Sequence, residues 1–370
     1  MAAIQSSSLP LRTRGAIATI LLCLLCCTVA RAAVPPARQV LLIHAFGLSA
    51  GFRATFDAAF SEALRRDTPP IDLHTETLDV QRVWPADTRR ALVDYIAAKY
   101  ANRHLDALAC VGDDALSVAR DARARLGDPP VVAVTFEGDA MREPEGRITG
   151  IDATPAYGDT IDLALSLKPE TRQVLVVDAA PYDRGDVSAE IQRQNRHRAL
   201  SIVPLHNLAL ADVLARVRAA PDDSVVLFVR QRLQSAGRDI DGLEALSAIS
   251  AASRVPLFSI NETHIGQGAT GGVVWQFDAL ARRTAAMARL AAFGVAATDI
   301  PHAVIDRRPI VDWRQLRRWN IREDLLPEGT LVLMRSTSPL EAYGGYVAGG
   351  LVLVILQLAL IGALIYQLVS

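Results

Sequence analysis

Short apolar runs alternate with longer amphipathic segments through most of this 370-residue chain, and this alternation constrains the fold more than any other feature. The apolar runs have the length of strands, and the segments between them have the length of helices. Such alternation predicts β-α units, in which parallel strands form a sheet that helices cover. The first predicted series has strands over Gln39–His44, Ile71–Leu78, Leu105–Val111 and Val131–Thr135, with helices over Phe52–Arg66, Ala86–Tyr100 and Asp113–Arg125.

A second series of the same kind follows Ile151, so the sequence predicts two similar α/β lobes. Its strands are expected over Gln173–Asp178, Leu200–His206, Val225–Phe228 and Pro256–Ile260, and its helices over Ala156–Leu167, Val187–Arg198, Leu208–Ala219 and Asp241–Ser253.

The last part of the body departs from a simple tandem. Gly272–Phe277 and Val304–Ile310 are strand-like, and a strong helix pattern covers Ala279–Phe293 between them. These pieces are expected to return to the first lobe and then cross back. The predicted first lobe is therefore 37–151 with 275–304, and the second is 152–274 with 305–336. The linkers Gly146–Ile151 and Thr298–Pro301 are expected near the hinge.

The N-terminus has the pattern of an export signal over residues 1–32. Arg12 and Arg14 precede the uncharged stretch Gly15–Ala30, and Ala30-Arg31-Ala32 matches a cleavage site. An uncleaved N-terminal anchor helix is the alternative.

The C-terminus predicts a transmembrane helix over 345–368. Val347–Leu368 carries no charge in 22 positions, which is long enough to span the hydrocarbon core. Tyr343 and Tyr346 lie at its entering edge, where aromatic rings favour the interface. A buried globular helix is the alternative. Together the two ends predict a single-span inner-membrane protein whose body lies in the periplasm.

Charge and cysteine content exclude several classes. The net charge is −1, with 39 basic and 40 acidic residues, so nothing indicates a nucleic-acid partner. Four cysteines are present, and only Cys110 lies in the body, so neither a disulfide nor a zinc site is expected there. The seven histidines are scattered without metal-ligand spacing. We expect no metal and no cofactor. The excess of Arg over Lys is typical of a bacterial gene with high GC content.

Several short motifs, in this order and ahead of a predicted span, resemble the type I periplasmic binding fold. More narrowly, the chain from Gln39 to Leu368 resembles the substrate-binding-protein-like input domains of bacterial membrane sensor histidine kinases, which are related to ABC-transporter substrate-binding proteins. The motifs are Val40–Phe46, Glu76–Asp79, Gly266–Gly268 with Gly271 and Gly272, Phe277–Leu280, Asp312–Trp319 and Leu326–Gly329.

The resemblance implies a small-molecule ligand, amino-acid-like or anionic, bound between two lobes, with no enzymatic activity. In the kinases a kinase region follows the span, whereas this chain stops at Ser370. Signal relay would then require a histidine kinase partner. An ABC permease is the alternative partner, with the chain as the substrate-binding component of the transporter.

Ligands of parallel α/β sheets bind outside the carboxyl ends of strands, which selects the candidate residues. In the second lobe, Asp178 could take an ammonium group. Arg230 could take an anion or form an ordinary salt bridge between the lobes. At Gly112-Asp113 a helix begins, so free backbone N–H groups could hold an anion, or Asp113 could be only an N-cap. Phe46 and Phe136 could stack on a ligand or belong to the core. The full predicted set is Phe46, Ser49, Gly112, Asp113, Thr135, Phe136, Asp178, Tyr182, Arg230, Asn261, Glu262, Trp275 and Asp278.

One motif points to an enzyme instead. Gly47-Leu48-Ser49-Ala50-Gly51 matches the G-x-S-x-G nucleophile elbow between a strand and a helix. It follows the first strand, so no upstream strand and loop remain to supply an oxyanion hole. A loop of small residues explains the pattern better, and a serine hydrolase using Ser49 is the alternative.

Overall fold

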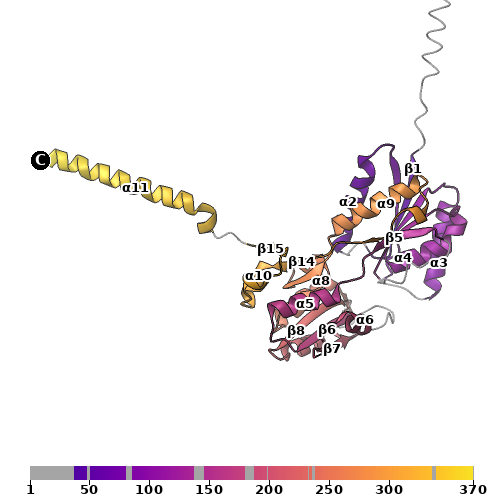
Figure 1. Cartoon of the computed structure of the whole chain (residues 1–370), viewed down its shortest axis with the longest axis horizontal. Helices are drawn as coiled ribbons and strands as arrows, with labels where there is room; N and C mark the ends of the chain where they lie inside the picture. Colours follow the sequence, from indigo (N-terminus) through magenta and orange to yellow (C-terminus); the bar gives the residue numbers. More distant parts are fainter. Residues whose placement is uncertain are drawn as a thin grey trace, which may run out of the picture.

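Two α/β lobes make up the body of the protein, and a long helix extends from the second lobe (Figure 1). The computed structural model describes residues 37–47, 51–80, 86–136, 146–179, 187–197, 199–231, 233–235, 238–335 and 339–369. The predicted export signal lies outside these residues. The expected two-lobed α/β architecture with parallel sheets is confirmed.

The first lobe is built on a fully parallel six-stranded sheet with the order β13-β5-β4-β3-β1-β2. Parallel strands need crossover connections, which the intervening helices supply. The strands are β1 (Arg38–His44), β2 (Ile71–Thr77), β3 (Ala107–Val111), β4 (Val131–Thr135), β5 (Ile148–Asp152) and β13 (Ala303–Val304).

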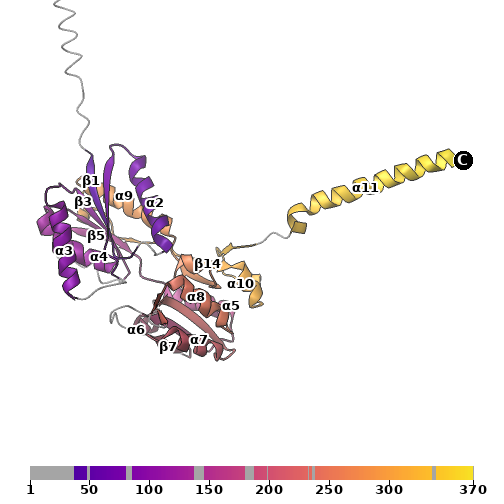
Figure 2. The ribbon, with the colours of Figure 1, turned by 180° about the vertical axis from the view of Figure 1, so that it is seen from behind.

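Helices cover both faces of this sheet, as Figure 2 shows. Successive strand residues point to opposite faces, so Leu42 packs against α2 and α9, whereas Leu41 packs against α3 and α4. Burial on both faces explains why these strands are continuous apolar runs. The helices are α2 (Gly51–Arg66), α3 (Ala86–Tyr100), α4 (Asp113–Arg123), η1 (Ala124–Leu126), α9 (Phe277–Ala292) and η3 (Ala297–Asp299).

A seven-stranded sheet with the order β15-β14-β12-β11-β8-β6-β7 forms the second lobe. Its pairs are parallel except β12 with β14, which is antiparallel. The strands are β6 (Gln173–Ala179), β7 (Ser201–His206), β8 (Ser224–Gln231), β11 (Leu257–Ser259), β12 (Gly271–Val274), β14 (Arg308–Asp312) and β15 (Leu331–Leu333). A separate antiparallel pair, β9 (Leu233–Ser235) and β10 (Arg238–Ile240), follows β8.

Two helical layers enclose the second sheet in the same way. One core joins α7 and α8 to one face, and the other joins α5, α6 and α10 to the opposite face. Asp241 caps α8 by accepting a hydrogen bond from the Leu243 backbone N–H at 3.0 Å. The helices are α5 (Tyr157–Leu167), α6 (Ser188–Gln194), α7 (Leu210–Arg218), α8 (Gly242–Ala252), η2 (Glu262–His264), α10 (Trp313–Arg318) and η4 (Glu323–Leu325).

Three segments carry the chain between the lobes, at residues 153–156, 275–276 and 305–307. The linkers Gly146–Ile151 and Thr298–Pro301, which were expected near the hinge, come just before two of these segments and lie within the first lobe. Most of Gly146–Ile151 belongs to β5, inside the first sheet, and Thr298–Pro301 overlaps η3. The strand-like run Val304–Ile310 is divided, because β13 ends in one lobe and β14 begins in the other.

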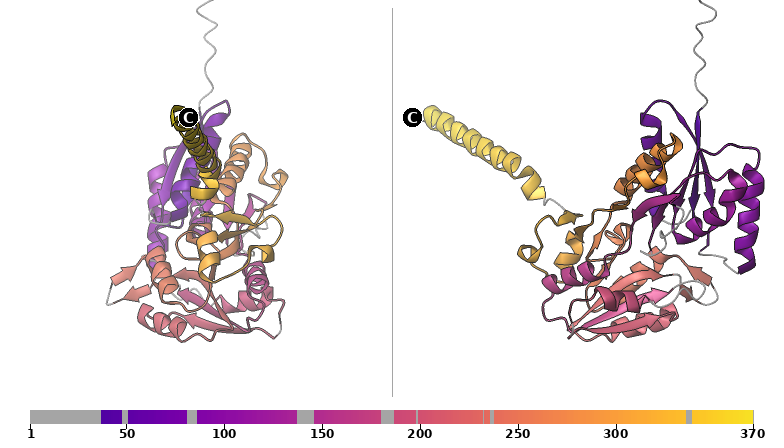
Figure 3. Two further views of the ribbon diagram at one scale, coloured as in Figure 1. Left: turned by 90° about the vertical axis from the view of Figure 1, so that its left-hand side faces the viewer. Right: turned by 45° about the vertical axis from the view of Figure 1, so that its right-hand side comes forward.

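The last helix, α11 (Pro339–Val369), stands apart from both lobes (Figure 3). Its section Ala348–Gln367 has a mean hydropathy of 2.5, and none of it is buried. Among the described residues, α11 alone is long and apolar enough to cross a membrane. Length and composition are the basis of this assignment.

Candidate functional site

The carboxyl ends of the first-lobe strands lie at the side from which the chain crosses to the second lobe. The crossing segment 153–156 directly follows β5, and β5 runs parallel to β4. Since neighbouring parallel strands end at one edge, the residues after β1, β3 and β4 lie at this same edge. The edge therefore faces the region between the lobes.

Five aromatic side chains gather at this edge, and we call them the aromatic row. The ring of Phe46 lies 5.4 Å from Phe52 and 5.7 Å from Phe136, both edge-on. The Phe136 ring stacks on Trp275 at 5.9 Å, and the Phe52 ring stacks on Phe277 at 5.0 Å. Phe46, Phe52 and Phe136 are partly exposed, whereas Trp275 and Phe277 are buried. The row joins the end of β1 to the crossing segment 275–276.

Gly112 makes room for this row. Its φ of 99° lies in the left-handed region, which favours glycine. A Cβ at this position would lie 2.7 Å from Cβ of Ala45 and 3.1 Å from Cε2 of Phe46. The missing side chain therefore lets Phe46 lie across the end of β3.

Two buried polar atoms beside the row lack a hydrogen-bond partner among the described residues. They are Nε1 of Trp275 and Oγ1 of Thr135. Trp275 is 6% exposed and Thr135 is 0% exposed. Leaving a buried polar group unpaired costs about 1–3 kcal/mol. Both atoms are therefore buried and unpaired in this form of the protein.

Asp113 has a partner within the protein. Its Oδ2 accepts a hydrogen bond from the backbone N–H of Phe136 at 3.1 Å, which links the start of α4 to the end of β4. Asp113 and Asp114 also place two carboxylates in the first turn of α4. Because like charges repel an incoming anion, this helix end is less suited to an anionic ligand than its position alone indicates.

In the second lobe, Asp178 is engaged by neighbouring groups. This side chain is 1% exposed, its Oδ2 lies 3.2 Å from Nδ1 of His206, and it accepts a hydrogen bond from the backbone N–H of Val187 at 3.4 Å. Across the β6–β8 pair, Asp178 is in register with Arg230, just after an irregularity in the ladder. The two predicted charged residues are therefore neighbours in the backbone of the sheet.

Three predicted residues lie before and after the crossing segment 275–276 and make contacts within the protein. They are Asn261, Glu262 and Asp278. Asn261 Oδ1 accepts a hydrogen bond from the Thr263 backbone N–H at 3.0 Å, and Glu262 Oε2 accepts one from the Phe277 N–H at 3.1 Å. Asp278 forms an ion pair of 2.6 Å with Arg282, one turn along α9. These contacts are capping and surface interactions. Ser49 and Tyr182 lie outside the described residues.

The structure thus brings Phe46, Gly112, Thr135, Phe136 and Trp275 together at one edge. Sequence reasoning missed Phe52 and Phe277, which complete the row. Phe52 begins a predicted helix after β1, which was a usable signal, whereas the place of Phe277 depends on the return of α9 to the first lobe.

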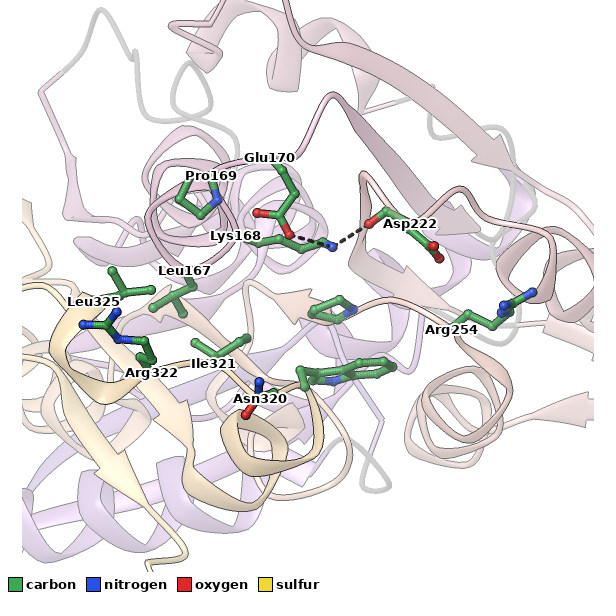
Figure 4. Close-up of a pocket in the computed structure, with 12 residues that line it drawn as sticks. Leu167, Lys168, Pro169, Glu170, Asp222, Arg254, Asn320, Ile321, Arg322 and Leu325 are labelled. Atoms are coloured by element: carbon green, nitrogen blue, oxygen red, sulfur yellow. Dashed lines mark hydrogen bonds and ion pairs between the residues drawn. The ribbon is translucent and has the colours of Figure 1, made fainter.

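A pocket of about 350 Å³ lies on the opposite, amino side of the second sheet (Figure 4). Its lining comes from the segments before β6, β8 and β11 and from the chain after α10. On one side Lys168 donates a hydrogen bond of 2.5 Å to the Asp222 carbonyl and lies 3.2 Å from the Glu170 carboxylate. This pocket is remote from the aromatic row, and the sequence did not predict it.

Within the described ranges, no three His, Cys, Asp or Glu side chains converge as a metal site would require. The buried thiol of Cys110 has its pKa raised by burial, which disfavours the thiolate needed for chemistry. The groups that the described residues place at the aromatic edge are aromatic rings and hydrogen-bonding atoms.

Comparisons with known proteins agree with this architecture. The family model for ABC transporter substrate binding proteins matches residues 131–319, slightly more than half of the 370-residue chain. A comparison with curated protein sequences finds no match.

Several solved structures share the fold. A conserved domain protein from Vibrio cholerae is 14% identical, with 80% of this chain and 99% of that chain covered and a TM-score of 0.59. A substrate binding protein with adhesive properties from Clostridium difficile, in a ligand-free, open form, is 14% identical, with coverage of 81% and 100% and a TM-score of 0.60. An ABC domain from Streptococcus pneumonia in complex with L-Trp is 12% identical, with coverage of 80% and 100% and a TM-score of 0.60.

At these identities the structures show the fold alone, which is the type I periplasmic binding architecture expected from the sequence. The assignment to a family comes from the match over residues 131–319. The chain belongs to the family of ABC transporter substrate binding proteins.

Proposed function

We propose that this chain is a membrane-tethered solute receptor that binds a small molecule between its lobes, outside the cytoplasm. The observation that carries the proposal is the aromatic row at the carboxyl edge of the first sheet, with two buried, unpaired polar atoms beside it. Such a combination of apolar faces and a few polar groups is typical of small-molecule sites. The proposed lobes are 37–151 with 275–304, and 152–274 with 305–336.

The proposed ligand has a flat apolar face that stacks on Phe46, Phe136 or Trp275, and a polar group that reaches Trp275 Nε1 and Thr135 Oγ1. An amino-acid-like molecule with an aromatic or other planar side chain meets both requirements. The L-Trp in the Streptococcus pneumonia structure supports this class. Ser49, Gly112, Asp113, Asp178, Tyr182, Arg230, Asn261, Glu262 and Asp278 remain the proposed surroundings of the ligand.

Delivery to an ABC permease is the role that the family match supports. Relay of a signal across the membrane is the second candidate, and the apolar helix α11 favours it, because a receptor that only delivers solute needs no span. We propose that residues 1–32 direct export and that 345–368 anchor the chain in the inner membrane. In the second role, a histidine kinase would be the partner.

Thermal-shift screening of the full chain in detergent tests ligand binding. The panel contains aromatic amino acids, aliphatic amino acids and polyols. A ligand at 100 times its dissociation constant is expected to raise the free energy of unfolding by about 2.7 kcal/mol. Trp275→Phe keeps the flat ring but removes the Nε1 donor, so it is expected to weaken the shift. If every class leaves the melting temperature unchanged, the proposal is wrong.

Deleting the gene separates the two roles. Loss of ligand uptake by the cells supports delivery, whereas normal uptake with loss of ligand-induced transcription supports relay.

A further inference from the structure

A single amide stands at the middle of the apolar section of α11. Gln357 is the tenth of the twenty residues from Ala348 to Gln367, and it is exposed. Its neighbours Leu356 and Leu358 are 65% and 63% exposed, so nothing in the described structure covers this part of the helix. At a rise of 1.5 Å per residue, Gln357 lies about 15 Å from either end of the section.

At this depth in a membrane, the side-chain amide of Gln357 requires a hydrogen-bond partner from protein. A glutamine side chain carries two N–H donors and a carbonyl acceptor. If Ala348–Gln367 spans a bilayer, as the proposed function requires, no water reaches Gln357, and its side chain is too short to reach either surface. An amide without a partner in hydrocarbon is costly. The partner must therefore come from another helix at the same depth.

The face of α11 around Gln357 suits a helix partner. Gly350 lies two turns earlier on the same face, because seven residues nearly complete two turns. Gly350 has no side chain, so the backbone of a neighbouring helix can approach α11 closely there. Leu353 and Ile361 lie one turn before and one turn after Gln357, which makes the rest of this face apolar.

We propose that α11 pairs with α11 of a second copy of this chain, through reciprocal hydrogen bonds between the two Gln357 amides. A second copy enters the membrane in the same direction, so its amide lies at the matching depth. Each amide can then donate to the carbonyl of the other. The pair is a parallel dimer that holds two ligand-binding bodies on one side of the membrane.

Energy transfer between donor- and acceptor-labelled full chains in liposomes tests this dimer. Gln357→Leu removes the amide and is expected to weaken association about fivefold to tenfold. Gln357→Asn keeps an amide at this depth and is expected to restore most of the energy transfer. Gln367→Leu is the matched control, since Gln367 lies at the end of the section where water is available.

Two outcomes would overturn the dimer. One is equal energy transfer for Gln357→Leu and the original chain. The other is a monomeric original chain at every protein-to-lipid ratio, which would mean that the amide serves another partner. Carbonate extraction of the same membranes separates these outcomes from failure of the proposed tether. A chain that is extracted has no span, whereas a chain that stays inserted without energy transfer contradicts the dimer alone.

Discussion

The carboxylate of Glu262, in the second lobe, accepts a hydrogen bond of 3.1 Å from the backbone N–H of Phe277, the first residue of α9 in the first lobe. The contact satisfies one of the free donors at the start of α9 and places a negative charge at the positive end of the helix. It also spans the crossing at residues 275–276, beside Trp275. A residue predicted to touch ligand thus joins the two lobes.

Glu262→Ala is expected to lower the free energy of unfolding by about 1 kcal/mol, because α9 loses a cap. Urea denaturation followed by circular dichroism measures the change. Glu262→Gln is the matched control, since its side-chain carbonyl can still accept the hydrogen bond, and it is expected to lose only a few tenths of a kcal/mol. Equal losses for the two variants would show that the hydrogen bond does not stabilise the protein.

Phe136→Ala is expected to weaken ligand binding roughly tenfold, because stacking on an aromatic ring contributes about 0.5–1.5 kcal/mol beyond the buried area. Isothermal titration with the ligand found by screening measures the dissociation constant. Tyr95→Ala, on α3 and away from the aromatic row, is the control and is expected to bind normally. Unchanged affinity in Phe136→Ala would move the site away from the row.

Stability is expected to fall in acid because of His264. Burial lowers the pKa of this imidazole from 6.5 to about 4, although the charge of Asp241 partly opposes the shift. Between pH 6.5 and 4, His264 is protonated in the unfolded chain but stays neutral in the folded protein. The stabilisation is therefore complete above pH 6.5 and is lost as the pH falls towards 4, by about 3 kcal/mol in total.

Urea denaturation at several pH values between 7 and 4 measures this slope, and His264→Gln provides the comparison. The variant loses the contact with Ser259, whose Oγ lies 2.6 Å from Nδ1 of His264, so it is expected to be less stable at pH 7. The stability of the variant should nevertheless depend less on pH, because its unfolding between pH 7 and 4 takes up one proton fewer than that of the original protein. An identical slope in both proteins would assign the acid sensitivity to other groups.

Gly272→Ala is expected to destabilise the second lobe by roughly 3 kcal/mol, at the upper end for overpacking. A Cβ at this position would lie 1.7 Å from the backbone carbonyl oxygen of Ser259, on the neighbouring strand β11. This oxygen belongs to the backbone of a paired strand, so it cannot move aside by rotation about a side-chain bond. Thermal unfolding measures the loss, and Gly349→Ala is the control, since a Cβ there meets nothing within 4 Å. Equal melting temperatures for Gly272→Ala and the original protein would show that β12 accommodates the Cβ without loss of stability.

The two α/β series could be predicted from the residues alone. The strands β1, β3 and β4 were predicted because each is a continuous apolar run between amphipathic helices, and burial on both faces of a parallel sheet leaves that pattern in the residues. The apolar section of α11 was determined in the same way, by its length and lack of charge.

The place of shorter or mixed runs depends on contacts that form only when the chain folds. Most of the expected linker Gly146–Ile151 belongs to β5, since pairing with β4 and β13 supplies hydrogen-bond partners for its backbone. Leu331–Leu333 and Trp313–Arg318 were not predicted at all, because three or six residues are too few to show a period. The roles of Asp113, Asp178 and Glu262 were likewise decided by their neighbours. Phe136, His206 and Phe277 are distant from them in the chain, and no local pattern records which polar groups will meet after folding.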